Sequence, residues 1–307
     1  MKRNTLIRLA VTLLLAHGAA WAQLSPTELL AYVPADAEVV VGLDVQTLTA
    51  NPAFDRLHHQ LNTQTFDAGV ATIEQVTGIN LLRDIERVVL LGELRNQGQG
   101  ALILKGHWYE EDLIALVAMN PSYEEQEHGA YSIHVWTDEN TGKVNHAVFL
   151  QPDVLAMSEW PAVLRRIIDA ASDRGRSLRS VQVPAQPDRE GVGAFLLAFR
   201  PADPNHNARK NPVIGQLESL AVGLQAGETE MTLSLDGRAQ DAHGATLLSE
   251  ALRGLLAAAQ LHVSGTRELP WPAQTRATGR QIESTVRVPM ETVIAAATTL
   301  KQAKAAN

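Results

Sequence analysis

One arrangement of strand, turn, strand and helix occurs twice in this chain, and it constrains the fold more than any other feature of the sequence. Residues 85–106 read IERVVLLGELRNQGQGALILKG, and residues 217–237 read LESLAVGLQAGETEMTLSLDG. Each stretch holds two apolar runs around a Gly-containing turn, which predicts a β-hairpin. Helical apolar spacing follows both of them, in residues 110–118 and 245–256.

The similarity extends in both directions along the chain. Upstream, residues 37–45 and 193–199 read as buried strands, and an Asn-Pro pair follows each of them. Downstream, Pro161 and Pro289 each precede a helical pattern, as expected for Pro in a first helical turn. We therefore expect an α+β fold of two similar units, each an antiparallel sheet with helices packed on one face, arising by internal duplication. The alternative is that any two-layer α+β chain shows such similarities.

The two expected units are separated by a charged segment that contains Pro184 and Pro187. Such a segment is typical of a linker. Val181 and Val183 leave open that it adds an edge strand instead. The expected boundaries are residues 1–22 for a signal peptide, 23–172 for the first unit, 173–190 for the linker or edge segment and 191–307 for the second unit.

The chain begins MKRNTLIRLAVTLLLAHGAAWAQ, with a basic start, a short apolar core and an Ala-x-Ala site ending at Ala22. This pattern predicts a secretory signal peptide, and so a periplasmic or secreted protein with no stable membrane insertion after cleavage. A retained anchor that keeps Trp21 is the alternative. The apolar run is about half of the roughly 20 residues that a span needs, and Arg8 interrupts it.

Composition excludes several classes of function. The chain has no cysteine, so thiol catalysis, thiolate metal sites and disulfides are absent. Its formal net charge is −8 and its aromatic content is 5%. The negative charge disfavours nucleic acid and anionic membranes as partners. The low aromatic content disfavours a site at which bases or sugars stack on aromatic side chains. The sequence also lacks the GxSxG, HExxH, Walker A and helix-opening GxGxxG motifs, so no catalytic residue or cofactor site is predicted.

Two histidines are the candidate metal ligands. His134 lies in a predicted strand, and His146 begins the next predicted strand after the turn TDENTGKVN. If that turn closes a hairpin, the two side chains lie nearly opposite each other and could bind zinc with a third ligand. The candidates for this third ligand are Glu127, His128 and Asp138. The alternative is a solvated sheet face with ordinary polar residues.

Several segments of the first half carry a resemblance to known proteins. These segments are PADAEVVVGLDVQTL, NPAFDRL, TGINLLRDIERVVLLG and ALILKG, within residues 34–119. They resemble a group of exported bacterial proteins of unknown function. The resemblance implies export and an α+β fold. It implies no catalytic residue, because that group has no established activity.

These observations predict an exported, soluble, non-enzymatic protein without a cofactor. We expect it to bind a protein partner in the cell envelope, or an extracellular ligand, through sheet faces or the cleft between the units. The alternative function is a metal-dependent hydrolase that uses His134 and His146.

Overall fold

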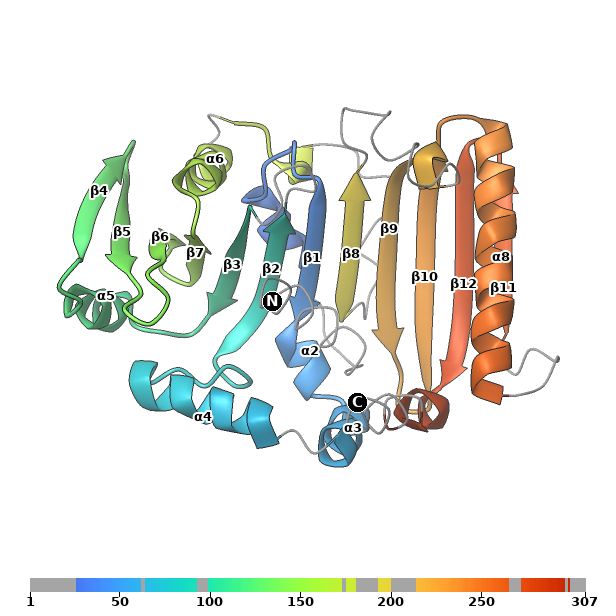
Figure 1. The fold of residues 1–307 in the computed structure, drawn as a ribbon, viewed down its shortest axis with the longest axis horizontal. Helices are drawn as coiled ribbons and strands as arrows, with labels where there is room; N and C mark the ends of the chain where they lie inside the picture. The colour runs from blue at the N-terminus through green and yellow to red at the C-terminus, as the bar shows by residue number, and fades with distance from the viewer. Residues whose placement is uncertain are drawn as a thin grey trace. The chain divides into compact units, whose positions relative to one another are not determined.

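The structure is a computed structural model. It describes residues 26–61, 64–92, 99–172, 175–180, 193–199, 214–264, 272–295 and 298 (Figure 1). The chain divides into two compact units, which we call the N-terminal unit and the C-terminal unit. The N-terminal unit comprises residues 26–46 and 63–183, and the described part of the C-terminal unit lies within residues 47–62 and 184–307. Residues 1–22, the expected signal peptide, are outside the described residues.

The N-terminal unit contains a ladder of strands in the order β1-β2-β3-β7-β6-β5-β4. Every neighbouring pair in this ladder is antiparallel. The hairpin predicted at residues 85–106 is present as β2 and β3. The strands are β1 (Val39–Asp44), β2 (Ile85–Gly92), β3 (Gly100–Gly106), β4 (Glu124–His128), β5 (Tyr131–Thr137), β6 (Val144–Gln151) and β7 (Val154–Ser158).

Helix α6 forms the main hydrophobic contact of the N-terminal unit. It begins at Pro161, as predicted, and its apolar side chains recur at helical spacing. Val163, Leu164, Ile167 and Ile168 are all buried, and the helix contacts β3, β6 and β7. The helical elements here are η1 (Pro26–Ala31), α4 (Gln64–Thr77), α5 (Glu110–Ala118), α6 (Pro161–Ala171) and η2 (Leu178–Ser180), and α2 (Val45–Thr49) spans the division between the units.

The two faces of this sheet are covered differently. On the face that α6 contacts, Val89, Ile103 and Val148 are fully buried. Alternate residues such as Leu90 and Leu102 point to the other face and are partly exposed. Helix α5 contacts β5 of the same sheet.

The C-terminal unit contains a ladder in the order β11-β12-β10-β9-β8, again with antiparallel neighbours. The second predicted hairpin is present as β9 and β10. The strands are β8 (Ala194–Phe199), β9 (Leu217–Ala226), β10 (Glu230–Ala239), β11 (Ala273–Thr278) and β12 (Gln281–Pro289), and the helical elements are α3 (Pro52–Leu61), η3 (Ile214–Gln216), α8 (Ala242–Ser264) and the helical residues 290–295.

Helix α8 covers one face of the C-terminal ladder, as predicted (Figure 1). Ala245 of α8 packs with Ala239 and Ile282 of the strands, and Leu235 and Leu248 lie against this cluster. The opposite face is polar along β10, β12 and β11, where Asp236, Glu283 and Arg276 occupy one cross-strand row. Alternation between an apolar and a polar face explains why this sheet is covered by α8 on one side.

The division into units differs from the predicted boundaries in one segment. Residues 47–62 belong to the C-terminal unit because Ala53 of α3 packs with Ala226, Met290 and Ile294. Arg56 adds an ion pair to Glu291 at 3.0 Å. Such a long-range assignment has no local signature in the sequence.

The beginning of the predicted linker is also part of a unit. Leu178 is 1% exposed, and its backbone N–H donates to Val33 O at 2.8 Å within the N-terminal unit. Val181 and Val183, the proposed edge residues, are outside the described residues. Within the described chain, no helix combines the length and the apolar character that crossing a bilayer requires.

Candidate interaction surface

The two candidate metal ligands point to opposite faces of the N-terminal sheet. In the register of β5 and β6, His134 pairs with Ala147, and His146 pairs with Val135. Directly paired residues share a face and successive residues alternate, so His134 and His146 are on different sides. The expectation that they lie opposite each other is wrong by one residue of register.

His134 belongs to a small aromatic cluster. Tyr123 Oη lies 2.9 Å from His134 Nδ1, and the two rings stack with centroids 6.1 Å apart. Phe149 meets the imidazole edge-on at 6.2 Å. Burial lowers the pKa of His134, and the nearby Glu125 and Glu110 carboxylates oppose this effect. The neutral ring therefore serves as a packed, hydrogen-bonded core group.

His146 is buried on the α6 side of the sheet. Burial lowers its pKa, a hydrogen bond with the Ser158 backbone acts in the opposite direction, and Arg165 lowers the pKa further. Its Nδ1 atom is buried without a hydrogen-bond partner. A buried imidazole nitrogen without a hydrogen-bond partner lowers the stability of the fold, so His146 is not the most stabilising residue for this position.

The proposed third ligands do not gather around either histidine. Glu127 shares the face of His134 but pairs with Ser132, two residues further along β5. His128 Nε2 lies 3.1 Å from Asp169 of α6, and Asp138 accepts backbone N–H bonds within its turn. Within the described part of the chain, no three His, Asp or Glu side chains come together in a way that could hold a metal ion.

A partly buried charge cluster lies at one end of the N-terminal sheet. Arg87 is 3% exposed; its Nη1 donates to Glu28 at 2.6 Å and its Nε is 3.7 Å from Asp44. Lys105 Nζ joins the same Glu28 at 2.9 Å and approaches Asp153 at 3.4 Å. Since each charged group faces an opposite charge, the cluster fits a clamp that holds η1 on the sheet.

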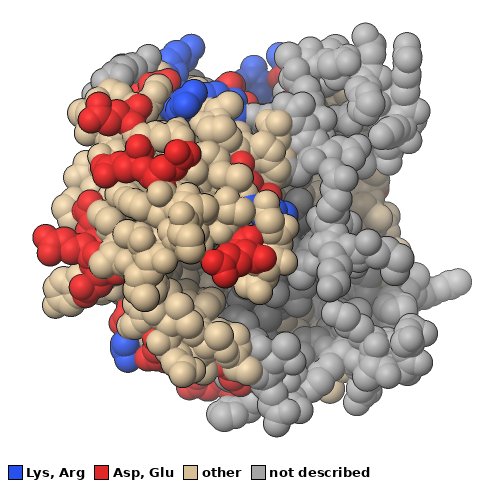
Figure 2. Space-filling view, turned by 60° about the vertical axis from the view of Figure 1, so that its left-hand side comes forward, with Lys and Arg blue, Asp and Glu red and all other residues tan. Residues whose placement is uncertain are grey.

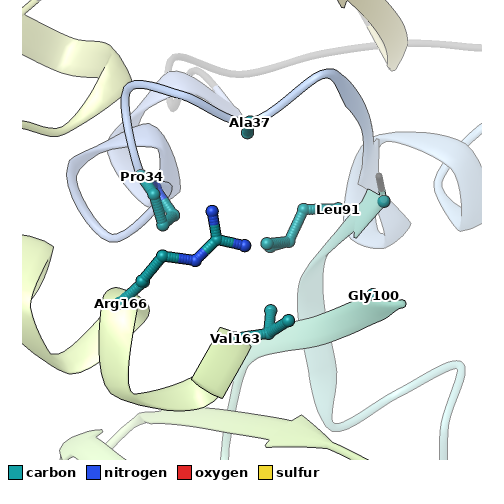
Figure 3. Close-up of a pocket in the computed structure, with 7 residues that line it drawn as sticks. Pro34, Ala37, Leu91, Gly100, Val163 and Arg166 are labelled. Atoms are coloured by element: carbon teal, nitrogen blue, oxygen red, sulfur yellow. The ribbon is translucent and has the colours of Figure 1, made fainter. Parts of the chain in front are cut away.

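A small hollow beside α6 is the clearest pocket of the described residues (Figure 3). Pro34, Leu91, Val163 and Arg166 line it, and the Arg166 guanidinium reaches into it while pairing with Asp36 at 2.9 Å. Its internal volume is about 10 Å³, roughly room for one water molecule. Ligand pockets usually reach roughly 300 Å³ or more, so this hollow does not suit an organic ligand.

Helix α5 has no buried residue, and a strongly exposed apolar side chain lies at each of its ends. Four of its nine residues are large and apolar, and all four are partly exposed. Tyr109 before the helix and Met119 after it are each 80% exposed, more than any other large apolar side chain described. We call the following six residues the α5 surface: Tyr109, Leu113, Ile114, Leu116, Val117 and Met119.

Acidic residues surround the α5 surface. Residues 106–142, which include α5, β4 and β5, contain eight Asp or Glu and no Lys or Arg. The rest of the printed sequence holds 26 acidic and 26 basic residues, so this stretch accounts for the whole net charge of −8. Figure 2 shows acidic side chains spread over the face that includes this end of the unit.

The α5 surface was not predicted from the sequence. The apolar spacing of residues 110–118 predicted a helix that packs on its own sheet. The signal that was present is the uninterrupted run without Lys or Arg from residue 106 to residue 142. Every charged side chain of this run, His aside, is acidic. Such unpaired charges are rarely buried, so complete burial of the helix in its own chain is a poor expectation.

Comparisons with known proteins give a likeness in structure and none in sequence. No family model matches the chain, and no curated protein matches it. The solved structures of TP0453, a Treponema lipoprotein, in crystal forms III, I and IV are similar at 11% identity. Their TM-scores are 0.46, 0.44 and 0.42, covering 91%, 91% and 88% of this chain and 100%, 99% and 96% of those chains. At these TM-scores the likeness carries no functional assignment.

Proposed function

We propose that this protein is an exported, non-catalytic protein that binds a protein partner through the α5 surface. The observation that carries the proposal is that α5 has no buried residue although it presents Leu113, Ile114, Leu116 and Val117. Exposed contiguous apolar groups with a polar rim are typical of protein interaction sites. Export rests on the basic start, apolar core and Ala-x-Ala site of residues 1–22.

The alternative function, a metal-dependent hydrolase, required His134 and His146 to lie opposite each other on the sheet. His134 and His146 lie on opposite faces, so they cannot bind one ion together without rearranging the sheet. The pKa of His134 and that of His146 are lowered chiefly by burial, not by a catalytic neighbour. A binding protein therefore fits the described residues better than a hydrolase.

An internal duplication is part of the same proposal. In both units a first strand is followed by a hairpin, a helix and a further set of antiparallel strands whose last member pairs back with the hairpin. That set is β4 to β7 in the N-terminal unit, with β7 pairing with β3, and β11 to β12 in the C-terminal unit, with β12 pairing with β10. By this correspondence α5 occupies the place of α8. Helix α8 buries Ala245 and Ser249 in its own unit, whereas no residue of α5 is buried. This difference favours a role for α5 in contacting another molecule.

Site-specific photo-cross-linking tests the proposed function. A benzophenone amino acid is placed at Tyr109 or at Met119, and irradiation is carried out in intact cells. The matched control is Leu255, a 69% exposed apolar residue on α8. We expect one adduct of the same mass from Tyr109 and Met119 and none from Leu255. In the protein labelled at Tyr109, the additional change Met119→Glu is expected to abolish the adduct.

Two results would overturn the proposal. One is the absence of any adduct from both α5 positions while the labelled protein is present at normal abundance. The other is the same set of adducts from Leu255, since this would indicate general stickiness rather than a defined surface.

A further inference from the structure

The carboxylates beside the α5 surface are concentrated around one place. Glu125 of β4 is the cross-strand partner of His134 in β5, so the two side chains share a face of the sheet. Helix α5, which begins at Glu110 and carries the partly exposed Leu113 and Ile114, contacts the same strand β5. Burial lowers the pKa of His134, and the carboxylates of Glu125 and Glu110 both oppose this effect, as groups near the ring would.

These carboxylates have no basic partners within the described chain. The eight acidic residues of 106–142 form no ion pair with any other described Lys or Arg. They are Glu110, Glu111, Asp112, Glu124, Glu125, Glu127, Asp138 and Glu139. No described Lys or Arg relieves their mutual repulsion, so a basic group placed among them would be attracted from a distance.

The chemistry of the surface selects one class of partner. Nucleic acid and anionic membranes would be repelled by the carboxylates. A wholly apolar partner would desolvate the carboxylates at the rim without compensating them. A partner with both apolar and basic side chains would cover the α5 surface and also pair with the carboxylates around it.

We infer that the partner contributes a basic amphipathic segment whose apolar side chains pack on the α5 surface and whose Lys or Arg side chains pair with Glu110 and Glu125. This inference rests on the proposed function and narrows it to one class of partner. It requires no change in the fold, because the apolar residues of α5 are already partly exposed.

A pair of synthetic peptides tests the inference. One is a 16-residue amphipathic helix with Leu on one face and Lys on the other, and the second has Glu in place of every Lys. Binding of each fluorescent peptide to the purified protein is measured by anisotropy at low salt. We expect the Lys peptide to bind and the Glu peptide not to bind.

Charge variants then locate the contact. The double variant Glu110→Gln, Glu125→Gln is expected to bind the Lys peptide with an affinity about fivefold lower at low salt, because two ion pairs at the rim are lost. The loss of affinity should be smaller at 0.5 M salt, which screens these ion pairs in both proteins. The matched control neutralises two exposed carboxylates of the C-terminal unit, Glu250→Gln with Glu283→Gln, and is expected to leave binding unchanged. Equal weakening by both pairs, or equal binding of the Glu peptide, would overturn the inference.

The native adduct separates this inference from the proposed function. If the Tyr109 adduct persists at the same yield in the Glu110→Gln, Glu125→Gln protein, the surface binds a partner that is not basic, and only the inference fails. If no adduct forms in the unaltered protein, the proposed function fails. Loss of the adduct in the charge variant but not in the control variant supports both.

Discussion

Glu28 and Arg87 are joined by a 2.6 Å hydrogen bond between Oε2 and Nη1, although their exposures differ sharply. The Arg87 side chain is 3% exposed and the Glu28 side chain is 47% exposed. The buried Arg87 guanidinium is thus compensated by the Glu28 carboxylate, which is still about half exposed to water. Glu28 also accepts from Lys105 at 2.9 Å, so one residue of η1 compensates two basic residues of the sheet.

Replacing Glu28→Gln should destabilise the N-terminal unit by about 1–2 kcal/mol, because Arg87 stays buried with only the more distant Asp44 as a counter-charge. The matched control is Asp36→Asn, which removes an exposed partner of Arg166. The control should cost roughly 0.5 kcal/mol or less. Urea unfolding measures both changes. Equal effects of the two variants would contradict the clamp described for η1.

Acid should weaken the same contact. The hydrogen bond from Lys105 and the bond from Arg87 lower the pKa of Glu28, against an opposing effect of burial. A carboxyl whose folded pKa is depressed contributes stability above its unfolded pKa and loses it as pH falls through the folded pKa. Stability from Glu28 should therefore fade below about pH 4. Unfolding free energies of the wild type and Glu28→Gln should converge between pH 5 and pH 3; a constant gap would contradict this.

Replacing His146→Leu should raise stability more at acid pH than at alkaline pH. Burial lowers the pKa of His146, so between its folded and unfolded pKa the unfolded chain binds the proton and the folded chain does not. Stability is then lost as pH falls below roughly 6.5, by no more than about 1.4 kcal/mol per pH unit. The Leu side chain cannot bind a proton, so the variant lacks this loss of stability at acid pH. Thermal unfolding at pH 8 and at pH 5.5 tests the prediction, and an equal increase in Tm at both pH values would contradict it.

Two glycine substitutions should change stability in opposite directions. Gly279 lies between β11 and β12 with φ +57°, a conformation that other residues adopt at a cost. Gly279→Ala should destabilise by about 1 kcal/mol. Gly254 lies in α8 with open space at its Cβ position, so Gly254→Ala should stabilise by about 0.5–1 kcal/mol. Chemical unfolding of the two variants provides the comparison, and changes of the same sign would refute the assignment of the turn.

The carboxylates of β4 should keep this strand from pairing with other chains. Within the described residues β4 has one neighbouring strand, β5, and its sequence is EEQEH. Charged edge strands resist edge-to-edge association. We expect Glu125→Val with Glu127→Val to increase self-association, measured by light scattering after size exclusion. Gln281→Val with Glu283→Val, on the doubly flanked strand β12, should not. Association of the control alone would contradict the expectation.

Local patterns predicted much of the fold. The two hairpins, the helix that begins at Pro161 and the long helix after the second hairpin follow from periodicity and turn residues, which act over a few neighbouring positions. The placement of α5 did not follow, because its apolar spacing is the same whether the helix packs on its own sheet or on another molecule. Periodicity identifies an apolar face and does not identify what covers it.

The histidine pair shows a second limit. The hairpin between His134 and His146 was predicted, but the face on which each side chain lies depends on the register across a six-residue turn. A shift of one residue exchanges the faces, and no residue in TDENTGKVN specifies that shift by itself. The α5 surface was not predicted either, since it depends on exposure and on charges drawn from α5 and β4 together.

The assignment of α3 to the C-terminal unit links the beginning of the chain to its end. Arg56 and Glu291 are 235 positions apart, and Ala53 packs against Met290 and Ile294. A chain that leaves the ribosome or crosses a membrane from its N-terminus presents α3 long before these partners arrive. The C-terminal unit can therefore close only after residues 290–294 have been synthesised, and a chain that stops before them leaves Ala53 without the side chains that cover it.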